Sequence, residues 1–305
     1  MRELTCPICE TAARRQLYRE TVEAEPRDAA ARVADPEGKH YRINQCLGCG
    51  LVYSSPIFDE GGVTALYTHS PHTNVRPGEE NNVRNTFQGY YRLARPHLAA
   101  RERILDIGCD MGLLLGMAAG DGFEELHGVE PNPMAAAVAR AVPRSRIVET
   151  FYESTTYPEA HFDLVTLIHV VDHLVEPIRL LTRVHRDLRP GGVVLAVVHN
   201  AGSLLARVLG ERFPPYNLYH HYFFTKRTLG LLFARAGLEP VWVGSTANSY
   251  SLDFLVDRAP LVPSPVRGAA RAALGRVGLG SLALTLPLGN IGIVARKPAG
   301  RAPRL

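Results

Sequence analysis

Short apolar runs recur through the central part of the chain, and segments with helical periodicity lie between them. The runs Phe162–His169 and Val193–His199 are apolar at nearly every position, which is typical of strands covered on both faces. Alternation of such strands with helices predicts an α/β fold with a doubly wound, mostly parallel seven-stranded sheet. The expected strands are Ile104–Ile107, a short strand ending at Glu130, Arg146–Val148, Phe162–His169, Val193–His199, Leu238–Val243 and Ile291–Arg296.

Helices are expected between these strands and ahead of the first one. Their positions follow from amphipathic or Ala-rich spacing and from Pro and Gly at the ends, such as Gly237 after the last helix. The expected helices are Glu60–Tyr67, Val83–Leu98, Leu113–Ala119, Pro133–Ala141, Ile178–Leu188 and Lys226–Ala236.

The first strand leads into a turn that contains Gly108 and Gly112, and a helix follows the turn. Glu130 lies 22 positions after Gly108, close to the spacing of about 20 between a glycine turn and the acid that binds a ribose. The free N–H groups at the start of the helix would face the ligand. This order is typical of a nucleotide-binding site, and a strand–turn–helix without a ligand is the alternative.

Acidic residues at the turn indicate which nucleotide the site prefers. A dinucleotide site needs Gly-x-Gly-x-x-Gly, but Asp110 and Leu113 occupy the second and third glycine positions. A pyrophosphate would be repelled by a carboxylate, whereas the sulfonium and ammonium groups of S-adenosylmethionine carry positive charge. Asp106, at the strand end, could accept a hydrogen bond from that ammonium. The acids therefore favour S-adenosylmethionine.

The pattern Asp106-x-Gly108-x-Asp110-x-Gly112, followed by Glu130, resembles the cofactor motif of class I S-adenosylmethionine-dependent methyltransferases. Asp110 stands where that family usually has glycine. The resemblance implies a Rossmann-like methyltransferase fold and S-adenosyl-L-methionine as cofactor. The implied cofactor-binding residues are Asp106, Gly108, Asp110, Gly112, Glu130, Asn132 and His169, of which Asn132 is also a candidate helix cap and His169 would act through its backbone.

Two downstream segments extend the resemblance. His169-Val-Val-Asp172-His173, which precedes Pro177, is similar to the family's segment after the fourth strand, with aspartate in place of the commoner glutamate. The turn at residues 189–192, Arg-Pro-Gly-Gly, is similar to the family's entry into the fifth strand.

Four of the five cysteines form two Cys-x-x-Cys pairs, Cys6 with Cys9 and Cys46 with Cys49, and Cys109 lies in the glycine turn. In a chain without a secretion signal such pairs indicate zinc before a disulfide. Two such turns complete a closed tetrahedral four-sulfur site, so we expect a structural Zn2+. A redox dithiol pair and free cysteines are the alternatives.

Methyl transfer requires an acceptor atom held about 3 Å from the methyl carbon, and an oxygen or a protonated amine also needs a base. Histidine suits that role near neutral pH. The candidates rank as His221, then His173, then His169, and His199 and His220 follow. His221 stands first because its aromatic segment resembles the family segment at the mouth of the substrate pocket. A packed structural histidine is the alternative for each.

Three regions are expected along the chain: a zinc ribbon over 1–56, a linker with lid helices over 57–100, and a methyltransferase domain over 101–305 with insertions at 200–225 and 259–289. The stretch Cys46–Pro56 resembles the ribbon attached to one bacterial subgroup of these methyltransferases. The second insertion has Arg267 and Arg271 four positions apart in an Ala- and Leu-rich stretch, so it could make a peripheral contact with a membrane or a partner. A plain insertion helix is the alternative, and Pro287 argues against a spanning helix.

The composition limits the classes of partner. A net charge of +4 over 305 residues is too small to indicate nucleic acid. No apolar run follows Met1, so we expect no signal peptide and a cytoplasmic location. The expected function is methylation of a small molecule in bacterial biosynthesis, such as a sugar, a polysaccharide precursor or a natural product. The alternatives are an RNA methyltransferase and a non-catalytic cofactor-binding module.

Overall fold

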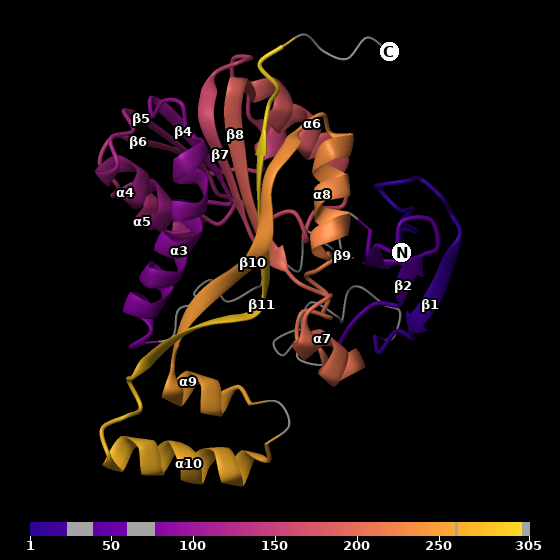
Figure 1. Ribbon diagram of the computed structural model, residues 1–305, viewed down its shortest axis with the longest axis vertical. Coiled ribbons are helices and arrows are strands. Elements are labelled where there is room, and N and C mark those ends of the chain that lie inside the picture. Colours follow the sequence, from indigo (N-terminus) through magenta and orange to yellow (C-terminus); the bar gives the residue numbers. More distant parts are fainter. Residues whose placement is uncertain (23–38, 60–76, 260–261, 301–305) are drawn as a thin grey trace.

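The computed structural model describes residues 1–22, 39–59, 77–259 and 262–300, and Figure 1 shows a large central sheet with a small sheet packed beside it. The helix expected at Glu60–Tyr67 lies outside the described residues. Within the described residues, no helix combines the length and the apolar character needed to cross a bilayer.

The large sheet has seven strands in the order β10-β11-β8-β7-β4-β5-β6. Strands β4 to β8 are parallel where they pair, and β11 runs antiparallel to both of its neighbours. The predicted doubly wound, mostly parallel seven-stranded sheet is therefore confirmed. Its strands are β4 (Arg103–Ile107), β5 (Glu125–Val129), β6 (Ser145–Val148), β7 (Phe162–Ile168), β8 (Leu188–His199), β10 (Glu239–Ser251) and β11 (Ala283–Arg296).

Helices cover both faces of this sheet, which explains why its central strands are apolar at nearly every position. Along β8, Val194, Ala196 and Val198 belong to the core that includes α6 and α8, whereas Val193 and Leu195 face the core that includes α3 and α4. The helices are α3 (Glu80–Ala94), α4 (Leu113–Gly120), α5 (Pro133–Ala139), α6 (Pro177–Asp187), α7 (Leu204–Leu209), α8 (Lys226–Arg235), α9 (Leu252–Asp257) and α10 (Ser264–Arg276), with 3-10 turns at η1 (Arg95–His97), η2 (Tyr152–Ser154) and η3 (Gly210–Arg212).

Strands β10 and β11 are longer than the sequence predicts. Asn290 of β11 pairs with His199, the last residue of β8, so residues 283–289 extend past the carboxyl end of β8. There they pair with β10, and the ladder continues to Ser251 opposite Ala283. Helices α9 and α10 lie at the end of this two-stranded extension (Figure 1).

The small sheet has the order β1-β2-β3-β9, in which β1 (Arg14–Tyr18), β2 (Ile43–Cys46) and β3 (Val52–Ser54) belong to the N-terminal ribbon. The fourth strand, β9 (Tyr222–Phe223), comes from within the segment expected as the 200–225 insertion, and it pairs with Val52 and Tyr53. The ribbon and the large domain therefore share backbone hydrogen bonds.

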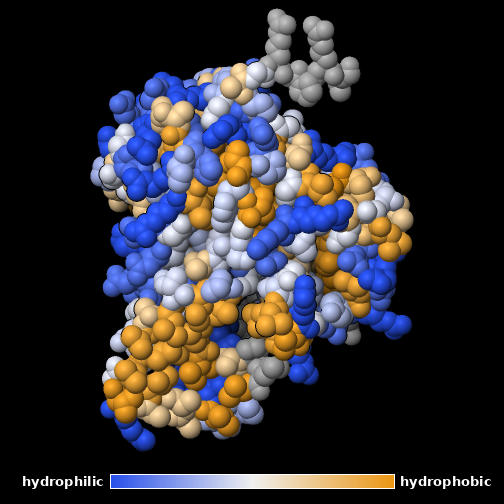
Figure 2. Space-filling model, in the orientation of Figure 1, coloured by the Kyte–Doolittle hydropathy of each residue, from blue (hydrophilic) through white to orange (hydrophobic). Residues whose placement is uncertain are grey.

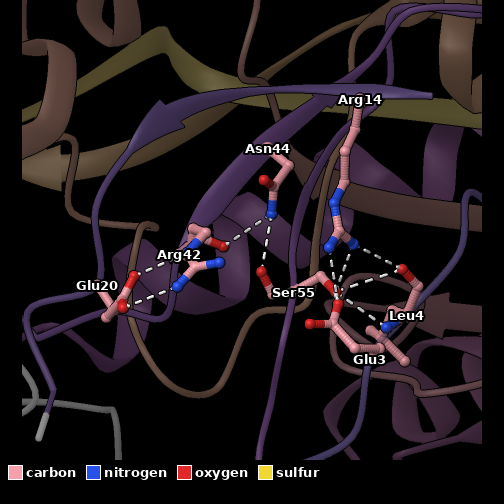
Figure 3. Close-up of polar contacts among 7 residues, drawn as sticks. All are labelled: Glu3, Leu4, Arg14, Glu20, Arg42, Asn44 and Ser55. Atoms are coloured by element: carbon pink, nitrogen blue, oxygen red, sulfur yellow. Dashed lines mark hydrogen bonds and ion pairs between the residues drawn. The ribbon is translucent and has the colours of Figure 1, made fainter. Parts of the chain in front are cut away.

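Ser55 is the centre of a polar network that holds the first residues of the chain against the end of β3 (Figure 3). Its Oγ accepts hydrogen bonds from the Leu4 N–H at 2.9 Å and from Arg14 at 3.0 Å, and it donates one to Glu3 at 2.7 Å. Its carbonyl accepts a hydrogen bond from Asn44 at 2.9 Å. This network fixes the backbone of the ribbon from which the Cys-x-x-Cys turns begin.

Candidate functional site

The turn after β4 has the conformation that its glycines permit. Gly108, Asp110 and Gly112 all have positive φ, at 71°, 45° and 76°. A Cβ at Gly108 would approach a methyl carbon of Val170 to 2.8 Å, which is too close. Only glycine fits there, because the turn lies directly against the loop that follows β7.

Three acids meet at this turn: Asp106 from β4, Asp110 from the turn itself and Glu130 from the position after β5. Glu130 accepts hydrogen bonds from the Asp110 and Asn132 N–H groups, both at 2.9 Å. Asp106 is buried and accepts a hydrogen bond from the Thr166 hydroxyl at 2.6 Å. Burial raises the pKa of Asp106 to about 7, and the charges of Glu130 and Asp110 add to that rise although the Thr166 bond opposes it.

This crevice fits S-adenosylmethionine better than a dinucleotide. Asp106 and Glu130 are buried and Asp110 is exposed beside them, and a positively charged ligand would relieve the repulsion that the other two acids exert on Asp106. It lies at the carboxyl ends of β4 and β5, the usual ligand side of such sheets. Asn132 uses its side-chain oxygen to cap α5, accepting from the Met134 N–H at 2.9 Å, so that oxygen serves the helix.

Asp172 is the centre of a second cluster, which follows β7. It is buried, and its carboxylate lies 2.9 Å from Nδ1 of His199 and 3.9 Å from Nε2 of both His173 and His220. The His169 ring lies 4.8 Å from the His199 ring, and the His199 ring lies 4.7 Å from the His220 ring. Four imidazoles therefore surround one carboxylate.

Burial keeps three imidazoles of this cluster in their neutral form. Burial alone would raise the pKa of Asp172, but the His199 hydrogen bond and the neighbouring imidazoles hold it well below its usual range. Burial lowers the pKa of His169 to about 3 and also lowers the pKa of His173 and of His220. These three imidazoles are neutral at pH 7 and carry a lone pair each.

The same cluster contains two sets of closely spaced donor atoms that could each hold a divalent ion. Asp172 belongs to both sets, one with His169 and His199 and the other with His173 and His220.

His221, the first-ranked candidate base, occupies a different place. Its side chain is completely buried, its Nδ1 lies 3.3 Å from the Leu174 carbonyl, and its ring lies 6.3 Å from the ring of Tyr41 in the ribbon. Its backbone joins the ribbon to the cluster, because its carbonyl accepts from the Ser54 N–H and its N–H donates to the Asp172 carbonyl, both at 2.8 Å. Its catalytic role stays a prediction.

The structure thus brings His173 and His169 together with His199 and His220, which the sequence ranked lower. The signal for His199 was present, because it ends the strand next to β7 in a parallel sheet. The sequence names His220 as a candidate base but does not place it beside Asp172, because His220 lies in a loop far along the chain.

The four ribbon cysteines converge as a metal site requires. Cys6 lies 3.4 Å from Cys49 and Cys9 lies 3.3 Å from Cys46, sulfur to sulfur, and all four sulfurs lie within 4.8 Å of one another. These separations exceed the disulfide length of about 2.05 Å and suit thiolates around one tetrahedral ion with metal–sulfur bonds of about 2.3 Å. The set could therefore hold a structural zinc ion. Cys109 is buried in the glycine turn, apart from this set.

Helix α8 holds both cysteine turns. Arg227 donates to the Cys49 carbonyl at 2.8 Å, and Arg235 donates to the Ile8 carbonyl at 2.6 Å and forms an ion pair with Glu10. The ribbon is thereby fixed to the helix that follows the His220 segment.

Comparison with known proteins identifies the large domain. Residues 80–243, or 164 of the 305 residues, match the family described as a methyltransferase domain. Two curated relatives are both named ubiquinone biosynthesis O-methyltransferase. That of Ruegeria pomeroyi is 34% identical over 46% of this chain and 60% of its own, and that of Alkalilimnicola ehrlichii is 32% identical over 36% of this chain and 48% of its own. The chain therefore spans about half the length of the curated relatives it matches.

Solved structures show the same fold at low identity. A chain from the Haloferax volcanii complex of a methyltransferase with the Trm112 activator has a TM-score of 0.53 at 17% identity, covering 74% of this chain and 96% of its own. A SAM-dependent methyltransferase from Archaeoglobus fulgidus has a TM-score of 0.50 at 20% identity, covering 72% and 97%. At these identities the likeness supports the fold alone.

Proposed function

The chain belongs to the methyltransferase domain family, and on that premise we propose that it transfers the methyl group of S-adenosylmethionine to an oxygen atom of a small molecule. One observation supports the proposal above the others. The crevice of three acids, Asp106, Asp110 and Glu130, lies against the loop that carries the Asp172 cluster, because Gly108 packs on Val170. A cation site and a set of neutral imidazoles thus share one end of the sheet.

The acid crevice supplies the residues that would hold the cofactor. Asp106 would face its positive charge, and Glu130, already fixed by two backbone N–H groups, would accept from ribose hydroxyls. When bound, S-adenosylmethionine supplies an electrophilic methyl group. The protein then has to orient the acceptor and remove its proton.

The Asp172 cluster supplies the base. His199 donates its Nδ1 proton to Asp172, which leaves the lone pair on Nε2 to accept a proton from the substrate hydroxyl. Asp172 would also stabilise the imidazolium that forms. We assign the base to His199, keep His173 and His169 as further catalytic candidates, and give His221 a positioning role, because its side chain is buried against the ribbon.

The acceptor class rests on the relatives. Those named above are O-methyltransferases of ubiquinone biosynthesis, which supports a hydroxylated biosynthetic intermediate as acceptor. Sugars, polysaccharide precursors and natural products stay in the set to be tested. The ribbon set of Cys6, Cys9, Cys46 and Cys49 would bind Zn2+ as a structural ion, since its four thiolates leave no open position.

The test is release of S-adenosylhomocysteine by the purified chain. The panel contains hydroxylated quinone precursors, sugars, nucleotide sugars and bulk RNA. We expect turnover with a hydroxylated small molecule and none with RNA. Turnover with RNA alone would establish the RNA methyltransferase instead, and cofactor binding with no turnover on the whole panel would favour a non-catalytic module.

A further inference from the structure

Helices α9 and α10 and the outer end of β11 form a projecting lobe beyond the end of β10, residues 252–259 and 262–288, which we call the apolar tip. Of the sixteen large apolar side chains that are exposed in the described part of the chain, seven belong to this tip. Figure 2 shows a broad hydrophobic surface over the lower lobe. The seven are Val262, Val266, Val277, Leu279, Leu282, Leu284 and Leu288.

No element of the described part of the chain buries the side chains of helix α10. None of its side chains is buried, and Val266 is 55% exposed while Val277, just after the helix, is 66% exposed. Val266, Ala269, Ala273 and Val277 follow helical spacing, so they fall on one side of the helix. An exposed apolar surface of this kind marks a docking site.

The tip lies on the same side of the molecule as the proposed active site. It continues from the carboxyl end of β8, where His199 pairs with Asn290. Helix α7, beside β11, adds two more exposed side chains, Leu204 at 75% and Val208 at 61% exposure. A flat partner that covers the tip would therefore lie next to the end of the sheet that carries the Asp172 cluster.

The charge of the apolar tip indicates which kind of partner it binds. From Arg258 to the end of the chain the sequence contains no Asp or Glu. The tip itself carries four arginines against Asp253 and Asp257, and Arg271 pairs with both of these acids. Arg267 donates to the Asp257 carbonyl at 2.6 Å, and four arginines against two acids leave the tip with a net positive charge. Positive charge together with exposed apolar side chains is the combination that binds anionic lipid headgroups.

We propose that the apolar tip docks on an anionic lipid bilayer, with its aliphatic side chains in the interfacial layer and its arginines on the headgroups. A second copy of the chain fits less well. The exposed apolar side chains of the tip are all Val or Leu, whereas protein interfaces concentrate their binding energy in aromatic anchors. With the function proposed above, docking would place the catalytic end of the sheet at the bilayer surface.

Vesicle flotation of the full-length chain tests this proposal. The vesicles are phosphatidylcholine alone or phosphatidylcholine with about a third phosphatidylglycerol, at low and high salt. We expect the chain to float with the anionic vesicles at low salt and to be released by high salt. Val266→Glu and Val277→Glu should each lower the bound fraction about fivefold or more, from the cost of one unfavourable charge near the surface.

Val138→Glu is the matched control, because Val138 is a valine of similar exposure, 51%, on α5 and outside the tip. It should float as the unchanged protein does. Equal flotation of all variants, or no binding to anionic vesicles, would overturn the proposal. Light scattering provides the second readout: a dimer that the Val266→Glu and Val277→Glu variants convert to monomer would assign the tip to a second copy and also overturn it. Turnover of a water-soluble acceptor is expected to be unchanged in both tip variants, so failure of docking is distinguishable from failure of the proposed function.

Discussion

The burial of Asp106 favours binding of a cationic ligand but lowers the stability of the free protein. Its carboxyl is buried beside two other acids, so the folded protein holds its proton to about pH 7 whereas an exposed aspartate releases it near 3.8. A ligand with a positive charge would reverse this cost. The residue is therefore suited to binding and unfavourable for the stability of the free protein.

We predict that Asp106→Asn stabilises the ligand-free protein in a pH-dependent way. An acid whose folded-state pKa exceeds its unfolded value costs stability as pH rises between the two, here from about 4 to about 7. The unfolding free energy of the variant should therefore exceed that of the unchanged protein by a margin that grows to the order of 4 kcal/mol above pH 7. Urea denaturation between pH 5 and pH 8 measures the margin. Glu124→Gln, at an exposed carboxyl, should show no such trend, and a pH-independent margin for Asp106→Asn would contradict the explanation.

A second prediction concerns the base. His199→Gln should lower kcat by about 10²–10⁴ with unchanged cofactor affinity, because it removes the proton acceptor and leaves the acid crevice intact. Asp172→Asn should act in the same direction by losing the His199 tautomer. His97→Gln, outside the cluster, is the control.

Steady-state kinetics with the acceptor found in the panel measure both variants. If His173→Gln or His169→Gln abolishes turnover while His199→Gln retains it, the base is one of those residues. A change confined to the pH profile would mark His199 as a positioning residue.

The two clusters differ in how far the sequence predicts them. Asp106, Gly108, Asp110 and Glu130 belong to one strand–turn–helix–strand unit, so their proximity follows from local spacing. The histidine cluster joins His169, at the end of β7, to His199, at the end of β8, and to His220 from a distant loop. Only the folded chain shows that Asp172 is the centre of that cluster, and that His221 is buried beside Tyr41 of the ribbon.

At the scale of elements, the ribbon is part of the structure that holds the active site. Strand β3 pairs with β9, and the Ser54 and His221 backbones connect the ribbon to Asp172. Arg227 and Arg235 of α8 hold the two cysteine turns from the other side. Loss of the metal should therefore change the structure beyond the ribbon.

We predict that Cys9→Ser loses the bound zinc and lowers kcat more than it weakens cofactor binding. The missing ligand loosens the ribbon and with it the loop that carries His220, whereas the acid crevice rests on the large sheet. Metal analysis by mass spectrometry, turnover assays and cofactor titration give the three readouts. Cys109→Ser, at the thiol outside the ribbon, should keep one zinc per chain. Full turnover in zinc-free protein would show that the ribbon does not support the site.

The extension of β10 and β11 is a structural element that the pattern of apolar residues does not predict. The sequence predicts strands at Leu238–Val243 and Ile291–Arg296, and these are the parts of β10 and β11 that lie in the seven-stranded sheet. Their outer halves carry small and polar residues, Pro287 and Gly289, which signal loops. They form strands because they pair with each other beyond the sheet, a contact between segments about forty residues apart.

At the scale of the whole molecule, one end of the sheet gathers the chemistry. The carboxyl ends of β4, β5, β7 and β8 carry the acid crevice and the histidine cluster, and the apolar tip extends past the same edge. The alternation of strands and helices predicts this topology, because parallel strands joined by helices place all their carboxyl ends together. The apolar tip could not be predicted from the sequence, because composition does not show which side chains are exposed on a projecting lobe.

The account depends on a cationic ligand in the acid crevice, and isothermal titration calorimetry measures this directly. The titrants are S-adenosylmethionine and NAD, and the proteins are the unchanged chain, Asp106→Asn and Glu130→Gln. We predict saturable heat with S-adenosylmethionine and none with NAD, and an affinity at least tenfold weaker in each variant, which corresponds to about 1.4 kcal/mol. Absence of heat with S-adenosylmethionine, or equal affinity in all three proteins, would contradict the account.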